Sequence, residues 1–424
     1  MKKVGVALLG LGTVGGGTYR ILEANREMIK KYQGVDLTVE HVLEKNLERC
    51  KQLGVDESIV STDINNVLNN PKIKIVAEFF GGIEPAKTFL IKSLEAGKSI
   101  VTANKELVAK YWHELEVAAK KGKAGIYFEA SCVGGVPIIR TLIEGMQGNN
   151  IQSIKGIVNG TTNYILTKMA DTGANYADAL REAQELGYAE FNPTADVEGY
   201  DASYKLSILS SLAFRTKVPL DKVSREGIST VKVEDIEYGK ELGMTLKLLA
   251  IGKNTNGKIE ARVHPTFVEN SSQLALVKGS FNAVSVVGDA VGEIMEYGRG
   301  AGDLPTGSAI VSDIVYAALK TRHTLSNFNN TTDQVSNRKF IFDYVTENYL
   351  RVDVGLGANP NAVVSLLKKH GVKLSNVSIK PLEDKVSIVM LTESIKDSKL
   401  NNAISLLSSI SGVIGLQARI RIER

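Results

Sequence analysis

The chain has 424 residues, of which 43% are hydrophobic and 23% charged, and its formal net charge is +4. This length predicts two or three domains, and the small net charge, with lysines scattered along the chain, argues against a nucleic-acid binder. Two cysteines, Cys50 and Cys132, lack disulfide or metal-ligand spacing, which predicts a reducing cytoplasmic location. No apolar run reaches the ~20 residues of a membrane span, so we expect neither a membrane segment nor a targeting signal.

The first predicted elements are a strand at residues 4–9 and a helix that follows a glycine-rich turn. The turn has the spacing G-x-G-x-x-G, with Gly10, Gly12 and Gly15. The first glycine permits the tight turn, the second lets the backbone approach a pyrophosphate, and the third allows close helix–strand packing. The phosphates would lie at the helix N-terminus. The pattern predicts a dinucleotide site, and the alternative is a glycine-rich turn without a ligand.

The second strand is predicted at residues 37–43, and two opposite charges, Glu44 and Lys45, follow it directly. An acidic residue at the end of this strand binds the ribose hydroxyls of NAD, whereas a basic residue accommodates the 2′-phosphate of NADP. Because both charges are present, the sequence leaves three interpretations open: NAD, NADP, and two solvated loop charges.

Two further stretches, "IKIVAEFFGG" and "KSIVTANKELVAK", each predict a strand followed by a loop. The loop after a parallel strand lies at the carboxyl edge of the sheet, where ligands of such sheets bind. Thr102, Asn104 and Lys105 are therefore expected near the cofactor. Residues 151–320 then alternate apolar runs with helical patterns, and "YADALREAQELG" predicts a helix that ends at Gly187.

The stretch "GYAEFNPTADVEGYDASYK", residues 187–205, combines several acids with one lysine. Asp201 and Lys205 are four residues apart, so in a helix they share one face. Taken alone, this spacing fits an exposed ion pair worth about 0.3–0.5 kcal/mol. The alternative is a polar pocket around Lys205, in which partial burial and neighbouring carboxylates would suit a lysine to proton transfer.

Residues 322–346 lose hydrophobic periodicity and gain Asn, Thr and Ser, which predicts a linker. The remainder, residues 347–424, predicts a separate small domain with the element order βαββαβ. We expect a strand at 348–356, a helix at 360–371, strands at 374–381 and 385–392, a helix at 397–410, and a last strand at 413–423.

Seven motifs carry a family resemblance: "GLGTVG", "GGIEPA", "VTANKEL", "FEASCVGGVPII", "GIVNGTTNYIL", "ELGYAEFNPTADVEGYDASYKL" and "GRGAG". In this order, over residues 1 to about 320, they resemble homoserine dehydrogenases. The resemblance implies reversible conversion of L-aspartate 4-semialdehyde to L-homoserine with NAD(P)H, in threonine and methionine biosynthesis. It also implies an α/β fold: a Rossmann-type domain at 1–133, completed by about 305–320, and an α+β substrate and dimerisation domain with an open mixed sheet at 134–304.

The resemblance also assigns roles to single residues. Lys205 would give a proton to the aldehyde oxygen and remove it in the reverse direction, and Glu190 and Asp201 would hold the substrate. Lys105 would lie close to both nicotinamide and substrate, where it either orients the substrate or contacts the cofactor. The positions implied for cofactor binding are Gly10, Leu11, Gly12, Thr13, Val14, Gly15, Lys45, Thr102, Lys105, Gly187 and Gly302.

A monovalent cation, usually sodium, binds the matching loop of the family, mainly through main-chain oxygens. The positions here are Glu129, Cys132, Gly134 and Val136. Cys132 is therefore interpreted as a buried bystander. The sequence departs from the family at Asn192, where aspartate is common. It departs also at Phe79 and Phe80, which make the loop of "AEFFGG" bulkier.

The C-terminal pattern resembles an ACT domain, a module that often binds an amino-acid effector and pairs with another copy. Asn361 stands near the position of the glycine on which such ligand sites rely, so threonine regulation and pure dimerisation stay open, and we expect a homodimer or homotetramer. Two other functions also remain: an aspartate-semialdehyde dehydrogenase, which needs an activated cysteine, and a non-catalytic NAD(P)-binding sensor, which would have lost the polar residues.

Overall fold

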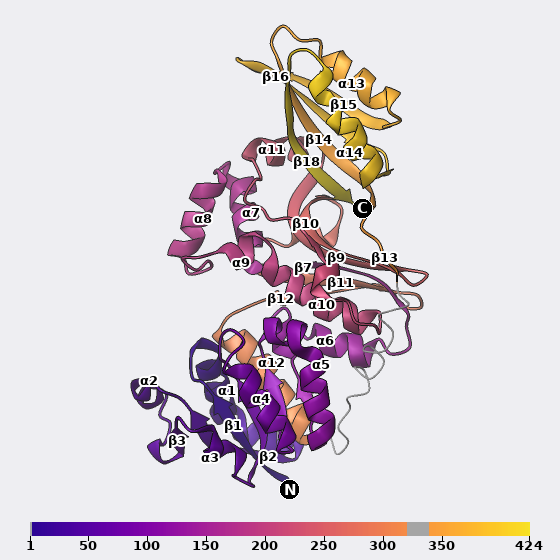
Figure 1. The fold of residues 1–424 in the computed structure, drawn as a ribbon. Helices are drawn as coiled ribbons and strands as arrows, with labels where there is room; N and C mark the ends of the chain where they lie inside the picture. The colour runs from indigo at the N-terminus through magenta and orange to yellow at the C-terminus, as the bar shows by residue number, and fades with distance from the viewer. Residues whose placement is uncertain (1, 320–338) are drawn as a thin grey trace.

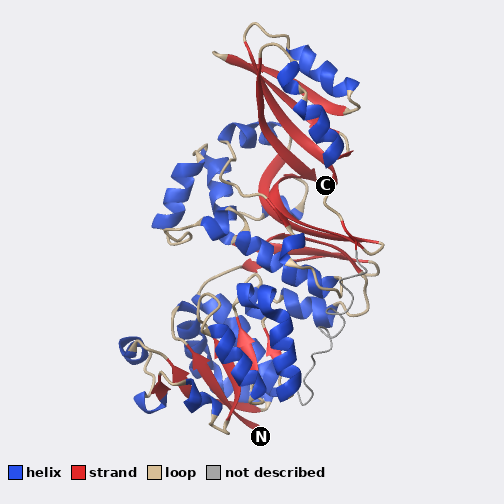
Figure 2. Cartoon of the chain, viewed as in Figure 1, coloured by secondary structure: helices blue, strands red, loops and turns tan. Residues whose placement is uncertain are grey.

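The computed structural model describes residues 2–319 and 339–424 of the chain (Figure 1). The molecule is elongated, and β1 and β16 lie towards opposite ends of it (Figure 1). Helices surround the sheet at the N-terminal end, whereas long strands run from the middle of the molecule to the other end (Figure 2). Within the described residues, no helix is both long and apolar enough to cross a membrane.

The first sheet has six strands in the order β3-β2-β1-β4-β5-β6, and each of these pairings is parallel. Its strands are β1 (Lys2–Leu9), β2 (Val35–Leu43), β3 (Val60–Ser61), β4 (Ile73–Glu78), β5 (Ser99–Thr102) and β6 (Ile126–Tyr127). The six residues of β1 after Lys3 are buried, as expected for a strand covered on both faces. This strand order confirms the predicted Rossmann-type fold.

The helices of this region are α1 (Thr13–Gln33), α2 (Leu47–Gln52), α3 (Ile64–Leu68), α4 (Ala86–Glu95), α5 (Lys105–Gly122) and α12 (Asp303–Leu319). α12 is far from α1 in the sequence but packs against it in the fold. The contact is tight, because a Cβ added to Gly17 of α1 would lie 2.3 Å from the carbonyl oxygen of Asp303. The start of α12 is therefore fixed beside the glycine-rich turn.

The second sheet has twelve strands and is mixed. Nine of them follow the order β12-β11-β7-β9-β10-β18-β14-β16-β15, and β8, β13 and β17 pair at its side. The strands in the middle are β7 (Ile151–Ile157), β8 (Ser224–Arg225), β9 (Met244–Thr255), β10 (Lys258–Glu269), β11 (Phe281–Gly288) and β12 (Gly292–Arg299). β10 pairs in parallel with the last strand of the chain, β18, at Thr266↔Arg421. The C-terminal strands are therefore continuous with the middle sheet.

The C-terminal elements largely have the predicted bounds. They are β13 (Lys339–Phe340), β14 (Val345–Gly355), α13 (Pro360–Lys369), β15 (Leu374–Pro381), β16 (Lys385–Thr392), β17 (Ile395–Lys396), α14 (Asp397–Ser405), the 3-10 turn η7 (Leu407–Ser409) and β18 (Val413–Glu423). β14 begins three residues before the predicted strand. Residues 322–338 of the predicted linker lie outside the described residues, and its last part contains β13 and the start of β14.

The middle region also holds six helices: α6 (Ile138–Arg140), α7 (Gly160–Thr172), α8 (Tyr176–Glu185), α9 (Thr194–Val197), α10 (Tyr200–Ala213) and α11 (Val233–Glu241). The chain also has short 3-10 helices, η1 (Glu57–Ile59) in the first region and η2 (Glu129–Ser131), η4 (Leu220–Lys222) and η5 (Gln273–Leu276) further on, and a π-helical turn, η3 (Thr141–Gly145). α10 packs against α5 on one side and against β9 and β10 on the other. It is buried over nearly its whole length, so any charged side chain on it needs a partner inside the protein.

A buried carboxyl group, that of Glu78, lies at the carboxyl edge of the first sheet. Glu78 ends β4 and Thr102 ends β5, and the two are directly paired in the parallel register. The Thr102 hydroxyl donates to Glu78 Oε2 at 2.5 Å, whereas Glu78 Oε1 has no partner among the described residues. Burial raises the pKa of Glu78 to about 7, although the hydrogen bonds from Thr102 and from the Phe80 backbone oppose this shift.

This raised pKa predicts a specific pH dependence of stability. The folded protein holds the Glu78 proton more tightly than the unfolded chain does, so the free energy of unfolding should fall as the pH rises from about 4.5 to about 7. The slope from this group is at most about 1.4 kcal/mol per pH unit. Glu78→Gln should lack this part of the fall, measured by urea unfolding followed by circular dichroism between pH 5 and 8. The exposed Glu48→Gln is the control, and parallel curves for the parent protein and Glu78→Gln would contradict the assignment.

Candidate active site

A cavity of about 620 Å³ lies where the carboxyl edge of the first sheet faces the loops of the second. Eight of the residues predicted from the sequence line it: Val14, Lys105, Gly134, Gly187, Glu190, Asp201, Lys205 and Gly302. The other predicted residues are outside its described lining: Gly10, Leu11, Gly12, Thr13, Gly15, Lys45, Thr102, Glu129, Cys132 and Val136. All four residues predicted for catalysis and substrate binding thus line one cavity, together with part of the set predicted for the cofactor.

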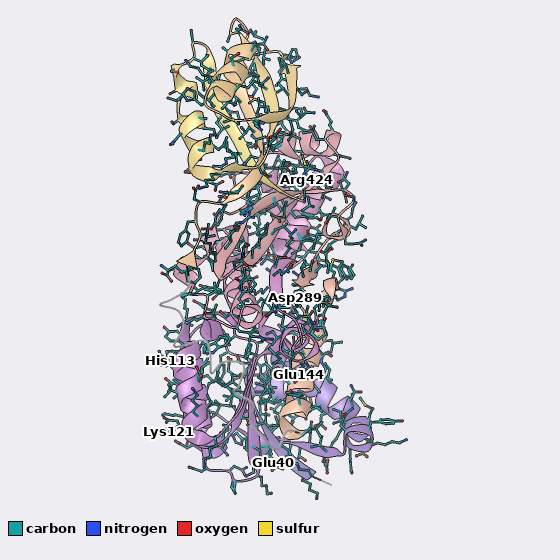
Figure 3. All side chains as sticks on the ribbon, turned by 90° about the vertical axis from the view of Figure 1, so that its right-hand side faces the viewer. Glu40, His113, Lys121, Glu144, Asp289 and Arg424 are labelled. Carbon is teal, nitrogen blue, oxygen red and sulfur yellow. The ribbon has the colours of Figure 1, made fainter. Side chains whose placement is uncertain are left out.

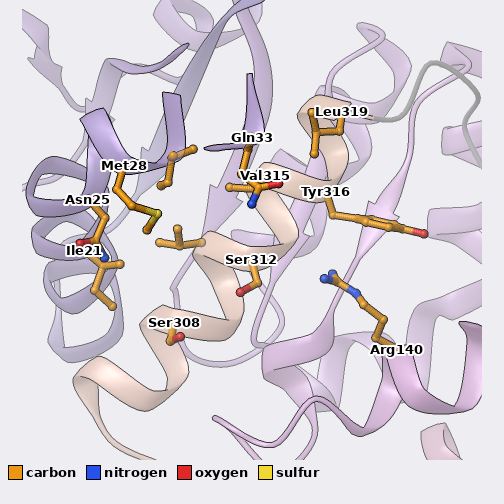
Figure 4. Close-up of a pocket in the computed structure, with 12 residues that line it drawn as sticks. Ile21, Asn25, Met28, Gln33, Arg140, Ser308, Ser312, Val315, Tyr316 and Leu319 are labelled. Carbon is orange, nitrogen blue, oxygen red and sulfur yellow. The ribbon is translucent and has the colours of Figure 1, made fainter. Parts of the chain in front are cut away.

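A second hollow, of about 390 Å³, lies between α1 and α12 (Figure 4). The guanidinium group of Arg140 lies 4.4 Å from the centre of the Tyr316 ring and bonds Asp313 at 2.7 Å. None of the predicted site residues is among the described residues that line this hollow. The first cavity is therefore the candidate active site.

Asp201 is buried between two lysines from different parts of the fold. Lys205 lies one turn further along α10, and its Nζ is 2.7 Å from Asp201 Oδ2. Lys105 comes from the first turn of α5, and its Nζ is 3.1 Å from Asp201 Oδ1. The side chains of Asp201 and Lys205 are only 6% and 10% exposed, so the interpretation of this pair as an exposed helix ion pair is wrong.

Electrostatics keep this aspartate ionised. Burial alone would raise the pKa of Asp201, but the charges of Lys205 and Lys105 and a hydrogen bond from Asn159 outweigh it and hold the pKa well below its usual range. The same contact raises the pKa of Lys105, chiefly through the Asp201 charge, while burial opposes that shift. The ammonium of Lys105 is therefore firmly protonated at neutral pH.

Two polar residues that the sequence did not single out complete this cluster. Asn159 caps α7 by accepting a hydrogen bond from the Thr162 N–H at 2.9 Å. Its Nδ2 donates to Asp196 Oδ1 at 2.7 Å and to Asp201 Oδ2 at 2.9 Å. Burial, and then the neighbouring Asp201 charge, raise the pKa of Asp196. An asparagine directly before a glycine and two threonines is an N-cap signal, but that signal does not say where the amide points.

Glu190 lies at the rim of the cavity, in the exposed loop between α8 and α9. Its carboxylate makes no hydrogen bond or ion pair with residues of the described ranges, so it is available to a ligand. The nearby Asn192 shapes the loop backbone instead, because its Oδ1 accepts from the backbone N–H and the hydroxyl of Thr194, at 3.3 and 2.7 Å. The departure from aspartate at position 192 therefore falls on a turn at the start of α9 and leaves the cavity lining intact.

The glycine-rich turn has the geometry that a dinucleotide requires. Gly10 has φ of +100°, and a Cβ added to Gly15 would lie 2.2 Å from the Gly10 carbonyl oxygen. At Gly12 an added Cβ would meet no described atom within 4 Å, so the backbone there is open to a ligand. Leu11, in contrast, is fully buried, and only its backbone can face the cofactor.

Glu44 is turned toward this glycine-rich turn. Its Oε2 accepts a hydrogen bond from the Leu11 N–H at 2.6 Å, and its Oε1 accepts from the backbone N–H groups of Lys45 and Asn46 at 2.8 and 2.9 Å. Lys45 is exposed. Of the two charges that the sequence left open, the acid is therefore fixed beside the turn.

Cys132 is unsuited to nucleophilic chemistry. It is completely buried, and burial raises the pKa of its thiol to about 12, although the Ser131 hydroxyl and the Lys205 charge oppose this shift. The thiolate, which is the nucleophilic form of cysteine, is therefore not populated at neutral pH. Cys132 therefore does not fit the activated cysteine that an aspartate-semialdehyde dehydrogenase needs.

Comparison with known proteins places the whole chain. The family model described as "Homoserine dehydrogenase, NAD binding domain" matches residues 10–129, and the model "Homoserine dehydrogenase" matches residues 137–315. The homoserine dehydrogenase of Bacillus subtilis is 38% identical, with 100% of this chain and 99% of that protein covered. That of Neisseria gonorrhoeae is 39% identical at the same coverage.

Solved structures agree with these sequence relatives. The crystal structure of a homoserine dehydrogenase from Thiobacillus denitrificans has a TM-score of 0.91 and 38% identity, with 100% of this chain and 99% of that chain covered. A hyperthermophilic archaeal homoserine dehydrogenase in complex with NADPH has a TM-score of 0.64 and 28% identity, over 76% of this chain and 99% of that chain. The chain thus belongs to the homoserine dehydrogenase family of NAD(P)-dependent oxidoreductases.

Proposed function

We propose that Lys205 is the acid–base residue of hydride transfer between NAD(P)H and L-aspartate 4-semialdehyde, which yields L-homoserine. The observation that supports this role is the pairing of a buried lysine with a buried aspartate inside the cavity. An ammonium group has three N–H donors. Two of them are used by Asp201 Oδ2 and by the Val158 carbonyl oxygen, both at 2.7 Å, which leaves the third for a substrate oxygen.

The proton balance follows from this arrangement. Bound NAD(P)H would supply the hydride. As the aldehyde carbon is reduced, the Lys205 ammonium gives a proton to the aldehyde oxygen, and in the reverse direction the neutral amine removes the hydroxyl proton. Lys105 adds a second positive charge close to the developing alkoxide and orients the substrate. Glu190, with a free carboxylate at the rim, pairs with the substrate ammonium.

A substitution of Lys205 tests this assignment. Lys205→Met keeps the unbranched apolar stem of the side chain but has no transferable proton, so kcat should fall roughly 10²–10⁴-fold. Reduction of aspartate 4-semialdehyde would be followed by NAD(P)H absorbance, and NAD(P)H binding by fluorescence should be retained. Lys222→Met, at an exposed ion pair outside the described cavity lining, is the matched control. A folded Lys205→Met variant with the kcat of the parent protein would refute the proposed role.

We further propose that NADH is the preferred cofactor. Glu44 is held by three backbone N–H groups beside the glycine-rich turn, so its charge cannot easily move away from a 2′-phosphate. The same carboxylate can accept hydrogen bonds from the ribose hydroxyls of NADH. Placing like charges side by side costs free energy, which lowers the affinity for NADPH.

Kinetics with both cofactors check this preference. Since 1.4 kcal/mol corresponds to a factor of ten, kcat/KM should be at least about tenfold higher with NADH than with NADPH. Glu44→Gln should reduce this ratio by improving NADPH and weakening NADH. Lys45→Gln serves as the companion variant, and it should change the ratio little because its side chain is exposed. A higher kcat/KM with NADPH in the parent protein would reverse the proposal.

We also propose a monovalent cation at the loop of Glu129, Cys132, Gly134 and Val136. Burial and then Asp313 raise the pKa of Glu129 to about 8, and each of its oxygens accepts one backbone N–H bond, so both keep a further lone pair. The backbone beside it is turned at Val133 and Gly134, with φ of 58° and 53°. A buried carboxylate with spare acceptor capacity, next to such a loop, fits a cation that binds oxygen.

Thermal unfolding in different salts tests the cation without an activity assay. A cation that binds only the folded state stabilises it by mass action, so the midpoint should be higher in sodium chloride than in N-methylglucamine chloride at equal ionic strength. Glu129→Gln should remove this difference. Equal midpoints of the parent protein in the two salts would count against the site.

For the C-terminal module we propose a role in assembly as a homodimer or homotetramer. Its edge strand β15 exposes Val377 and Ile379, which are 40% and 42% exposed. An effector site has less support: Asn361 lies inside α13, where its N–H bonds the capping Asn359, and the turn before the helix carries Gly357 instead. A threonine effector would have to be held by the backbone of that turn.

A further inference from the structure

A short segment, residues 224–228, lies between the loop that precedes Asp201 and the last strand of the chain; we call it the strap. It contains β8 and the three residues that follow it. We propose that Arg225 of the strap is a positioning residue for the start of α10, and that the ion pair of Glu226 with Arg421 couples this position to the C-terminal strand. The inference rests on the proposed roles of Asp201 and Lys205.

The start of α10 depends on outside support. Gly199 at its N-cap has φ of 76°, and no side chain of the described residues caps the helix. Arg225 has only donors and so does not cap the helix N–H groups, but it holds the residues at the helix start: its Nη1 donates to the Glu198 carbonyl oxygen at 2.6 Å, and its guanidinium lies 3.4 Å from the centre of the Tyr200 ring. A Cβ added to Gly199 would lie 3.3 Å from Arg225 Cγ. Arg225 therefore contacts all three residues immediately before Asp201.

The backbone of the strap is fixed against the same loop. The Ile228 N–H donates to the Val197 carbonyl oxygen at 2.8 Å, and the Ile228 side chain is completely buried. At Gly227 an added Cβ would lie 2.6 Å from the same carbonyl oxygen, so a larger residue has no room there. These contacts fix the position of the strap against the loop. They thereby also fix the backbone that carries the Arg225 side chain.

The other side of the strap is bonded to the second sheet and to the C-terminal module. Glu226 donates its backbone N–H to the Val263 carbonyl oxygen in β10 at 2.8 Å. Its carboxylate accepts from Arg421 Nη1 in β18 at 2.6 Å. Arg421 Nη2 in turn donates to Asp397 Oδ2, at the start of α14, at 2.8 Å. A displacement of β18 or α14 would therefore move Arg421, and Arg421 would in turn move Glu226 of the strap.

This geometry gives Arg225 an effect on catalysis without contact with the substrate. Within the described part of the chain, Arg225 is not among the residues that line the 620 Å³ cavity. Asp201 is the second residue of α10, so a tilt of the first turn changes its distance to Lys105 before it changes anything in the core. A misplacement of about 1 Å in an active site can cost 10²-fold in rate.

Kinetics of strap variants test the proposal. Arg225→Ala should lower kcat about tenfold, with KM for the cofactor within about twofold and the thermal midpoint nearly unchanged, because Arg225 is exposed. Arg225→Lys, which can still donate to the Glu198 carbonyl oxygen, should restore part of the loss. Arg421→Gln should lower kcat in the same direction and by less, because its effect passes through Glu226.

The matched control is Arg424→Gln, at the end of the same strand (Figure 3). Arg424 forms ion pairs with Glu269 and Glu347 and does not contact the strap within the described residues. Arg424→Gln should therefore leave kcat unchanged. A kcat for Arg225→Ala equal to that of the parent protein would overturn the proposal, and so would a loss as large in Arg424→Gln as in Arg421→Gln.

A double variant separates this proposal from the proposed role of Lys205. If Arg225 acts through α10, Arg225→Ala should lower the residual rate of Lys205→Met by much less than it lowers the rate of the parent protein. Equal factors in the two backgrounds would show that Arg225 acts elsewhere and would overturn the inference. A failure of the proposed function appears differently, as a Lys205→Met variant that keeps full activity.

Discussion

The ionised carboxylate of Asp201, buried between Lys205 and Lys105, is the interaction on which the site depends. A charge in a buried position is tolerated only when it is paired and hydrogen-bonded, and Asp201 has two ammonium groups and the Asn159 amide. These partners come from α10, from α5 at the edge of the first sheet, and from the cap of α7. One carboxylate therefore ties α5 of the nucleotide-binding region to α7 and α10 of the middle region, at the proposed site of hydride and proton transfer.

The second sheet extends this constraint to the C-terminus. The β10–β18 pairing is accompanied by buried ion pairs, among them Arg262 with Glu423 at 3.1 Å. Between α11 and β14, Asp235 accepts two hydrogen bonds from Arg351, at 2.6 and 2.9 Å. Breaking such a buried pair costs about 3–5 kcal/mol, because the remaining charge is left without a partner. The C-terminal module is thus held in one register against the substrate region, which is the condition for a strap between them to transmit a displacement.

The features that the sequence predicted correctly are those that short-range patterns of residues determine. The glycine-rich turn, the helix that carries Asp201 and Lys205, and the bounds of β15, β16 and β18 all follow from spacing and periodicity over about twenty residues or fewer. The sequence did not reveal the β10–β18 pairing, because the partners are about 155 residues apart and either strand could have been an edge. Thr102 shows a further limit: its place at the sheet edge was predictable, but its hydroxyl is used by Glu78, which lies in the neighbouring strand.

Charged side chains of the cavity lie in two places, at its inner end and at its rim. At the inner end Lys105 and Lys205 share Asp201, and Asp196 lies beside them on the Asn159 amide. In the proposed function the two ammonium groups face the aldehyde oxygen as it becomes an alkoxide. At the rim Glu190 is exposed, and its carboxylate has no partner in the part of the chain that the structure describes. L-Aspartate 4-semialdehyde carries its ammonium and its carboxylate at one end and its aldehyde at the other. In the proposed function Glu190 pairs with that ammonium, and the two lysines face the aldehyde oxygen. In this proposed mode the ammonium groups that stabilise the alkoxide also disfavour a reversed substrate, because its own ammonium would then lie beside two lysines.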